Sequence, residues 1–180
     1  MDVPAGPDDA GGLGHLAVLG FAPERSRGCP SSSWLDELAR GIERARYWAG
    51  PVLIVGGEPE QRANLAALIH SRGPTRDGFL RRVDCRAEPE VRRAFELCRA
   101  GGPERGTTFF DYLEALPRGA PRELLDLLES ASGAVPAGGE GTSRLMAGIH
   151  DAEARSSAAS PCLDALVDTL DKWRIELARR

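Results

Sequence analysis

Short apolar runs and amphipathic stretches follow one another along the chain. The apolar run Val52–Val55 is typical of a buried strand. Further short apolar runs predict strands at 80–83, 107–110, 145–149 and 174–177. Apolar residues spaced three and four positions apart predict helices at 34–49, 65–72, 88–98, 121–128 and 163–170. This alternation predicts a three-layer α/β/α sandwich with a mainly parallel sheet.

The ends of this pattern set the expected domain boundaries. Residues 1–14 are rich in Pro, Gly and Asp and show no apolar periodicity, which is typical of a flexible tail. We predict a single α/β domain over residues 15–180, because a chain of 180 residues is long enough for one sizeable core. The Gly-rich stretch 131–142 and the small, polar stretch 151–160 predict loops within it.

Composition and charge narrow the class of partner. Hydrophobic residues make up 42% of the chain and charged residues 28%, as in soluble globular proteins. The net charge of −4 argues against a dedicated nucleic-acid-binding domain, so we expect no direct DNA binding. No apolar run has the length of a membrane span, and residues 1–14 lack the pattern of a signal peptide. We therefore expect a cytoplasmic protein without a membrane partner.

The cysteine and histidine positions do not predict a metal site. The cysteines form no C-x-x-C pair, and reduced thiols are expected at Cys29, Cys85, Cys98 and Cys162. The histidines also lack the spacing of metal ligands: His15, His70 and His150. No metal ion is expected.

Large aromatic residues lie at both ends of the first predicted helix. They are Trp34, Tyr47 and Trp48. Such residues also stack on nucleic-acid bases, but the acidic net charge disfavours that role. We predict that they anchor the helix to the core.

The segment Pro51–Leu65 has the outline of a phosphate-binding loop. An apolar β-branched run meets a glycine turn, and a helical pattern follows at once. A working loop reads G-x-x-x-x-G-K-[ST]. When Gly56 is laid on its first glycine, Gln61, Arg62 and Ala63 fall where Gly, Lys and Ser/Thr belong. The outline is kept and the phosphate-binding residues are replaced.

Each replacement removes part of the phosphate-binding chemistry. Pro59 has no N–H to donate, and Glu58 and Glu60 place carboxylates where a phosphate would lie. Arg62 is able to form a bidentate contact with phosphate, but its planar fork does not replace a compact ammonium. Ala63 cannot bind magnesium. The simpler alternative is a strand–turn–helix unit that never bound nucleotide.

Six motifs in order make the chain similar to a known family. They lie at residues 52–56 with 66–70, 83–90, 95–97 with 106–113, 116–117 with 123–129, 144–147, and 170 with 175–177. Over residues 33–178 their order and spacing resemble the AAA+ domain of the bacterial enhancer-binding proteins, the ATP-driven activators of sigma-54 RNA polymerase. This resemblance implies a P-loop NTPase core of the AAA+ type.

Several positions differ from the family at the residues that bind and hydrolyse nucleotide. Asp111 stands where the family holds magnesium, but Tyr112 replaces the carboxylate that activates water. A phenol with a pKa near 10 is a poor base at neutral pH. His150 stands at the position of a polar sensor asparagine. Leu163 and Thr169 stand where the family supplies arginines to a neighbouring subunit's nucleotide.

Two parts of the family's architecture have no counterpart in the sequence. The loop that contacts sigma factor is missing, because Cys98 leads directly through residues 99–105 into the strand that begins near Gly106. The sequence ends at Arg180, before the helical lid and the helix-turn-helix that usually follow. We therefore expect an AAA+-like domain without a lid or a DNA-binding domain.

These observations favour a regulatory protein over an enzyme. The leading hypothesis is a pseudo-ATPase without catalytic residues or cofactor, which binds or sequesters a protein partner. The oligomeric state is left open, and a homo- or hetero-oligomer is compatible with this hypothesis. One alternative is a nucleotide-binding switch without efficient hydrolysis, in which Gly56, Gly57, Arg62 and Asp111 are the residual site. Another is a co-regulator of sigma-54-dependent transcription. The partner itself cannot be read from the sequence.

Overall fold

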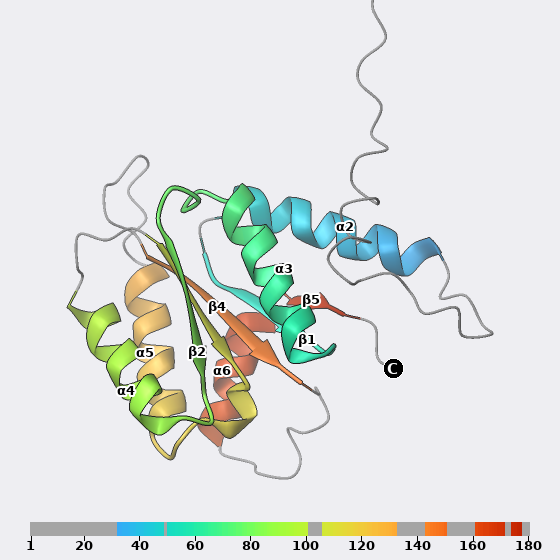
Figure 1. Ribbon diagram of the computed structural model, residues 1–180. Helices are drawn as coiled ribbons and strands as arrows, with labels where there is room; N and C mark the ends of the chain where they lie inside the picture. Colours follow the sequence, from blue (N-terminus) through green and yellow to red (C-terminus); the bar gives the residue numbers. More distant parts are fainter. Residues whose placement is uncertain are drawn as a thin grey trace, which may run out of the picture.

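The computed structural model describes residues 32–48, 50–100, 106–132, 143–150, 161–171 and 174–177 (Figure 1). Its strands are β1 (Val52–Val55), β2 (Phe79–Asp84), β3 (Gly106–Asp111), β4 (Ser143–Ile149) and β5 (Arg174–Glu176). Its helices are α2 (Ser32–Tyr47), α3 (Pro59–Arg72), α4 (Glu88–Arg99), α5 (Ala120–Ser132), α6 (Pro161–Asp171) and the short 3₁₀ helix η2 (Leu113–Ala115). The predicted tail 1–14, the predicted loop 151–160 and residues 133–142 of the predicted loop 131–142 lie outside the described residues. The prediction of a loop from residue 131 is wrong at its start, because α5 continues to Ser132.

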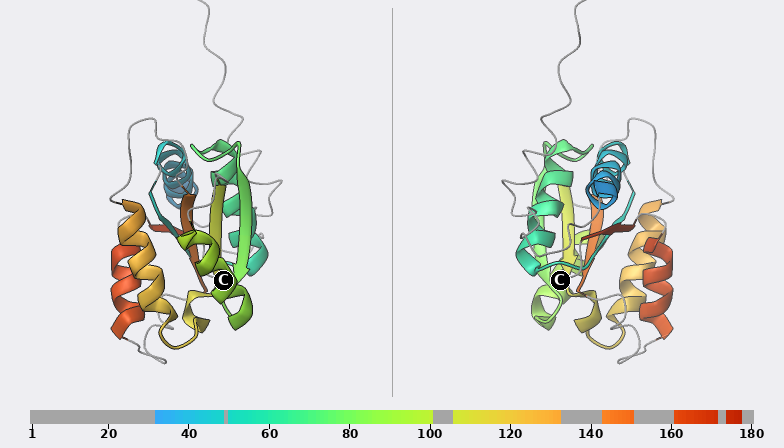
Figure 2. Two further views of the ribbon diagram at one scale, coloured as in Figure 1. Left: turned by 90° about the vertical axis from the view of Figure 1, so that its left-hand side faces the viewer. Right: turned by 90° about the vertical axis from the view of Figure 1, so that its right-hand side faces the viewer.

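The strands form one parallel sheet in the order β2-β3-β4-β1-β5. Helices α2 and α3 cover one face, and α4, α5 and α6 cover the other (Figures 1 and 2). A parallel strand covered on both faces is typically an apolar run, and β1 is such a strand, with all four residues buried. The three-layer α/β/α sandwich with a parallel sheet, predicted from the alternating pattern, is confirmed.

A separate hydrophobic core lies on each side of the sheet. On the side of α4, α5 and α6, Phe95 packs against Phe110 with ring centroids 5.7 Å apart. On the side of α2 and α3, Leu38 and Ile69 pack with Phe109. Successive strand residues point to opposite faces, so Phe109 and Phe110 contribute one ring to each core.

Arg144 holds the end of α2 against the sheet. Its Nη2 donates to the carbonyl oxygen of Ala45 at 2.7 Å, and its Nε donates to that of Gly50 at 3.3 Å. A cation near the last carbonyls of a helix is favourable. Burial lowers the pKa of Arg144 to about 10, so the side chain stays charged at neutral pH.

The predicted anchoring role is wrong for Tyr47, whose side chain is 77% exposed. The buried stripe of α2 runs through Leu38, Ile42 and Ala45. A residue two positions after Ala45 lies on the opposite side of a helix with 3.6 residues per turn. Trp48 is also exposed, and the side chain of Trp34 lies outside the described residues.

No helix in the described part is long and apolar enough to cross a membrane.

Candidate functional site

The turn between β1 and α3 is too short to be a phosphate-binding loop. Strand β1 ends at Val55 and α3 begins at Pro59, which leaves Gly56–Glu58 between them. In a phosphate-binding loop, the G-x-x-x-x-G-K segment connects the strand to the helix. Here the helix has already begun three residues before Arg62. The chain therefore has no long loop that wraps around a phosphate at this point.

The two glycines of the turn make room for the end of the chain's fifth strand. Gly56 and Gly57 have φ of 82° and 68°. A Cβ on Gly56 would lie 2.8 Å from the carbonyl oxygen of Leu177, and one on Gly57 would lie 2.7 Å from Leu177 Cδ1. The backbone N–H of Leu177 in turn donates to the carbonyl oxygen of Val55 at 2.7 Å. These contacts give the glycines a structural role.

The N-terminus of α3 is capped by its own side chains. Glu58 and Gln61 form a capping box, in which the Glu58 N–H donates to Gln61 Oε1 at 2.9 Å. Pro59, the first residue of the helix, has no N–H. The free donors at a helix N-terminus are the groups that bind anions. In this helix the capping box engages part of that donor set, and Pro59 removes another donor.

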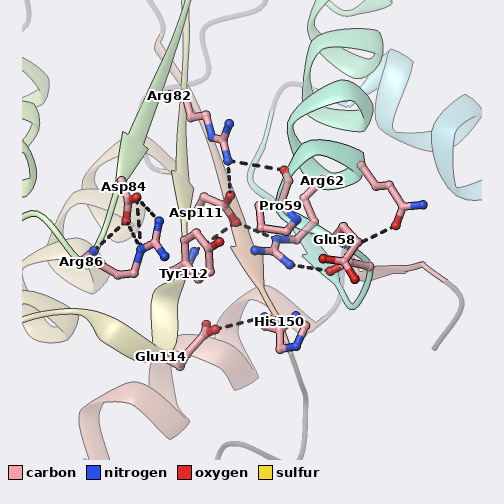
Figure 3. A network of polar contacts seen from close by, with 12 residues as sticks. Glu58, Pro59, Arg62, Arg82, Asp84, Arg86, Asp111, Tyr112, Glu114 and His150 are labelled. Carbon is pink, nitrogen blue, oxygen red and sulfur yellow. Dashed lines mark hydrogen bonds and ion pairs between the residues drawn. The ribbon is translucent and has the colours of Figure 1, made fainter. Parts of the chain in front are cut away.

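Arg62 turns inward from α3 and is completely buried. Its Nε lies 2.6 Å from Asp111 Oδ1, and its Nη1 donates to the carbonyl oxygen of Gly57 at 2.7 Å (Figure 3). Its Nη2 is buried and has no hydrogen-bond partner. The guanidinium thus lies between the glycine turn and the end of β3, on the side that phosphate and magnesium occupy in a working P-loop.

Asp111 ends β3 with both carboxylate oxygens in use. Oδ1 accepts from Arg62 and, at 3.1 Å, from the backbone N–H of Tyr112. Oδ2 lies 2.9 Å from Nη2 of Arg82, on neighbouring β2. Gly148 on β4 leaves space beside the carboxylate, because a Cβ there would lie 2.8 Å from Oδ1. Two arginines therefore neutralise the carboxylate that would otherwise attract a cation.

Tyr112 has an unusual backbone conformation between two guanidinium groups. Its φ of 63° and ψ of 53° are left-handed, and no other described non-glycine residue has a positive φ. The Cζ atoms of Arg86 and Arg62 lie 3.9 and 5.0 Å from the centre of its ring. Cations at these distances are attracted to an aromatic ring. The ring is thus a packing surface for arginine.

Asp84 fixes Arg86 in this position (Figure 3). Its Oδ1 accepts from Arg86 Nε at 2.9 Å and its Oδ2 accepts from Arg86 Nη2 at 2.6 Å. This hydrogen bonding lowers the pKa of the Asp84 carboxyl group below its ordinary value. It also raises the pKa of the Arg86 guanidinium. The pair is charged at neutral pH and holds the guanidinium over the Tyr112 ring.

The structure brings the residues of the predicted residual nucleotide site together. The other positions that differ from the family lie outside this group. Gly57, Arg62 and Asp111 are in direct contact, and Gly56 adjoins them in the turn. The predicted lack of catalytic residues is not tested by this arrangement. In the described part, no group of three or more His, Cys, Asp or Glu residues has a metal-binding arrangement.

The remaining positions that differ from the family occupy three environments. His150 follows β4 and is exposed, with its backbone N–H 3.4 Å from Glu114 Oε1. Leu163 lies in α6 and is buried in the hydrophobic core on that side of the sheet. Thr169 is exposed and its hydroxyl donates to the Ala165 carbonyl oxygen at 2.8 Å. Leu163 and Thr169 therefore have structural partners within their own domain.

Sequence reasoning missed Arg82 and Arg86. Arg82 contacts Asp111, and Arg86 contacts the ring of Tyr112. The signal was available in the strand pattern. Arg82 lies on a predicted strand one position before its end, and the ends of neighbouring parallel strands meet at one edge of the sheet. The sequence pattern does not contain the order of the strands in the sheet. That order places β2 beside β3.

The charged side chains at this end of the sheet pair with one another. Asp111 has no oxygen free of a cation or an N–H donor, and the Arg62 guanidinium is directed at protein oxygens. Phosphoryl transfer requires a metal ion and positive groups directed at the nucleotide phosphates. These groups are directed at one another here.

Comparison with known proteins defines the fold. No protein-family model matches the sequence, and no curated protein matches it. The structure is similar to NtrX from Brucella abortus in complex with ATP (TM-score 0.62, 16% identity, 82% of this chain and 36% of NtrX). It is also similar to the P-loop NTPase domain of the sigma-54 transport activator from E. coli (TM-score 0.60, 17% identity, 81% of this chain and 95% of that domain). The chain thus spans little more than a third of NtrX, and its α/β core resembles the P-loop NTPase domain of sigma-54 activators, as the sequence motifs predicted.

Proposed function

We propose that this chain is a catalytically inactive, AAA+-like regulatory protein that binds or sequesters a protein partner. The proposal includes a cytoplasmic location, no cofactor, and no direct contact with DNA or a membrane. It leaves the oligomeric state open between a monomer, a homo-oligomer and a hetero-oligomer. The protein would use the α/β core as a rigid scaffold for an interaction surface.

One observation carries the proposal. The buried guanidinium of Arg62 is paired with Asp111 at 2.6 Å and with the Gly57 carbonyl oxygen at 2.7 Å. A nucleotide with its magnesium ion would have to displace this guanidinium. Separating a buried ion pair leaves an uncompensated charge and is unfavourable by about 3–5 kcal/mol. An affinity gain of this size would be needed before any net binding, so the internal pair opposes nucleotide binding.

The chemistry around the pair supports the same conclusion. Tyr112 and Ala63 supply neither a base for water nor a ligand for magnesium. Groups that hydrolyse nucleotide act as a unit, so a single remaining carboxylate at Asp111 gives little catalysis. The capping box of α3 also engages donors at the helix N-terminus that bind phosphate in a working loop.

Affinity purification tests the binding role. The tagged chain is expressed in its source organism, and proteins that it retains are identified by mass spectrometry and confirmed with purified components. We expect a stoichiometric complex with one protein, of unchanged affinity when Mg-ATP is added. If the purified chain retains no specific protein under any growth condition, the binding role is wrong.

A nucleotide-binding switch is the second candidate, and one observation favours it. Nη2 of Arg62 is buried and has no hydrogen-bond partner, so a donor remains unused beside the glycine turn. A phosphate oxygen is a suitable acceptor for it. If Mg-ATP raises the melting temperature of the wild type and Arg62→Ala abolishes that rise, the switch is favoured over the nucleotide-free scaffold.

The same purification tests a role in sigma-54-dependent transcription. This role is proposed because the chain has the fold of a sigma-54 activator's NTPase domain. Recovery of an intact activator as the partner would favour a co-regulator that joins or blocks the activator's oligomer. Recovery of an unrelated protein would favour sequestration.

A further inference from the structure

Strand β2 forms an open edge of the sheet. It pairs with β3 and stands at the end of the strand order (Figure 1). The N–H of Cys85, directly after the strand, donates inward to the carbonyl oxygen of Asp111 at 3.0 Å. Backbone groups alternate in direction along a strand, so those of Leu80 and Arg82 point outward. Within the described part, these outward groups have no partner.

The last outward N–H of β2, that of Asp84, is covered, unlike those of Leu80 and Arg82. The N–H of Asp84 also points outward, but it faces Glu90 Oε2 at 3.5 Å. A side chain of α4 therefore covers the last outward donor of β2. The open stretch is limited to Leu80–Arg82, which is long enough for a few backbone hydrogen bonds from an added strand.

The side chains around this open stretch are apolar and basic. Leu80 is 36% exposed, and Leu97, on the α4 helix that packs against β2, is 42% exposed. Arg81 is half-buried over the ring of Phe79, with its Cζ 4.6 Å from the ring centre. Arg81 forms no ion pair with a described residue. A partly buried cation without a carboxylate partner is suited to an acidic ligand.

A second copy of the chain is a poor occupant of the same edge. Two identical strands related by a two-fold axis pair antiparallel. Because outward-facing residues must oppose each other in an antiparallel pair, the register that overlaps Leu80–Arg82 fully places Arg81 opposite Arg81 of the copy. Like charges directly opposite each other are destabilising in a sheet. Charged residues in the middle of an edge strand prevent this kind of self-association.

We propose that the outer edge of β2 binds an extended acidic segment of a partner protein by strand addition. This inference rests on the proposed function, because it names the surface and the chemical class of that partner. Backbone groups of Leu80 and Arg82 supply the hydrogen bonds. Leu80 contacts apolar side chains of the segment on one face of the sheet, and Arg81, whose side chain lies on the opposite face, pairs with a carboxylate.

A short blocked peptide of alternating valine and glutamate tests the inference. It is titrated into the full chain, and amide hydrogen exchange is followed by NMR. We expect saturable binding that slows exchange at Leu80 and Arg82. A matched peptide with lysine in place of glutamate should bind at least about tenfold more weakly. The inference is wrong if the glutamate peptide does not bind at millimolar concentration, or if exchange at Leu80 and Arg82 stays unchanged.

Two variants of β2 separate backbone pairing from charge. Leu80→Pro removes one outward N–H, which an edge strand tolerates because no bond to β3 is lost. It should weaken binding of the glutamate peptide about tenfold or more. Arg81→Glu should reverse the preference in favour of the lysine peptide. Arg122→Glu, an exposed arginine of α5, makes the same charge change elsewhere and should leave the preference unchanged.

The same variants separate failure of this inference from failure of the proposed function. If the wild type, Leu80→Pro and Arg81→Glu all retain the same cellular partner equally, the protein binds a partner through another surface and the β2 inference is wrong. Sedimentation of the wild type gives a further outcome. A dimer that Leu80→Pro converts to monomer would mean that a second copy occupies the edge, and would overturn the proposal.

Discussion

The contact between Arg62 and Asp111 is the residue-scale feature on which the proposed function rests. Both side chains have no exposed surface, and their closest atoms are 2.6 Å apart. A buried carboxylate needs a compensating cation. In an NTPase domain that cation is a metal ion. In this chain it is the guanidinium of Arg62 in the same domain. The pair therefore links the start of α3 to the end of β3 without any ligand.

Loss of this arginine should destabilise the fold strongly. Arg62→Met leaves Asp111 with only the half-exposed Arg82 as a cation, so we expect a loss of about 3 kcal/mol in the free energy of unfolding. The double variant Arg62→Met with Asp111→Leu should recover most of this loss, because no charge remains buried. Urea unfolding of Arg62→Met, Asp111→Leu and the double variant measures the coupling free energy between Arg62 and Asp111.

Arg82→Gln provides the control for that experiment. The Arg82 side chain is 45% exposed, so its ion pair with Asp111 is screened by solvent and should contribute about 1 kcal/mol or less. If Arg62→Met and Arg82→Gln have equal effects, the buried pair is not the stabilising contact that the structure indicates.

Tyr112 should reverse the usual order of glycine and alanine. With φ of 63°, an alanine at this position keeps the left-handed strain and loses the ring contacts to arginine. Glycine also loses these contacts but adopts this conformation freely. We expect Tyr112→Gly to be more stable than Tyr112→Ala by about 1 kcal/mol in thermal unfolding. The ordinary order, with alanine more stable, would show that the backbone is not left-handed here.

At the scale of elements, the turn between β1 and α3 is shaped by its contact with Leu177. Gly56→Ala introduces both a positive-φ strain and a Cβ 2.8 Å from the Leu177 carbonyl oxygen. Gly119→Ala is a matched control, because its φ is 88° and a Cβ there meets nothing within 4 Å. We expect a loss of about 1 kcal/mol for Gly119→Ala and clearly more for Gly56→Ala. Equal losses would mean that Leu177 does not pack on the turn.

A buried polar chain joins α3 to β3 and should make stability depend on pH. His70 Nδ1 lies 2.9 Å from Thr107 Oγ1, which lies 2.8 Å from Thr75 Oγ1. Burial lowers the pKa of His70 below its ordinary value near 6.5, and the charge of Arg144 lowers it further. Near and below pH 6.5 the unfolded chain therefore binds more protons than the folded one. Stability should fall as the pH drops through about 6.5 and level off below the folded pKa.

Variants of two histidines test this assignment. The melting temperature is measured between about pH 7.5 and 5 for the wild type and for His70→Gln, which should lose part of the decrease. His150→Gln changes an exposed histidine and should keep the wild-type profile. An unchanged profile in His70→Gln would assign the acid sensitivity to other groups.

The element pattern was predictable because it depends on local spacing. The buried strand β1 is a continuous apolar run, and the buried helix residues form apolar stripes. The start of α3 was not predicted at Pro59, because the motif comparison placed the loop through Arg62. The inward turn of Arg62 was also beyond local patterns, since its partner Asp111 is 49 residues away. Pairing at this distance depends on strand order, which single-chain periodicity does not contain.

At the scale of the whole molecule, the α/β core is similar to the NTPase domain of a sigma-54 activator, and the Arg62–Asp111 pair joins α3 to β3 inside it. Domains of this size are stabilised mainly by their hydrophobic cores, so the fold does not require a bound nucleotide. The open edge of β2 is the outer side of the strand beside β3, and the side chain of its residue Arg82 also contacts Asp111. A strand added there would bond to the backbone of β2 and would leave the Arg62–Asp111 pair intact.

The most direct test of this account is a thermal unfolding titration with Mg-ATP. NtrX from Brucella abortus, whose structure contains ATP, serves as the positive control. A ligand at 100 times its Kd adds about 2.7 kcal/mol of stability, which corresponds to a rise of roughly 5–10 °C for a domain of this size. We predict no change in the melting temperature of this chain at millimolar Mg-ATP. A saturable rise of several degrees would contradict the account, because it would mean that the Arg62–Asp111 pair does not prevent nucleotide binding.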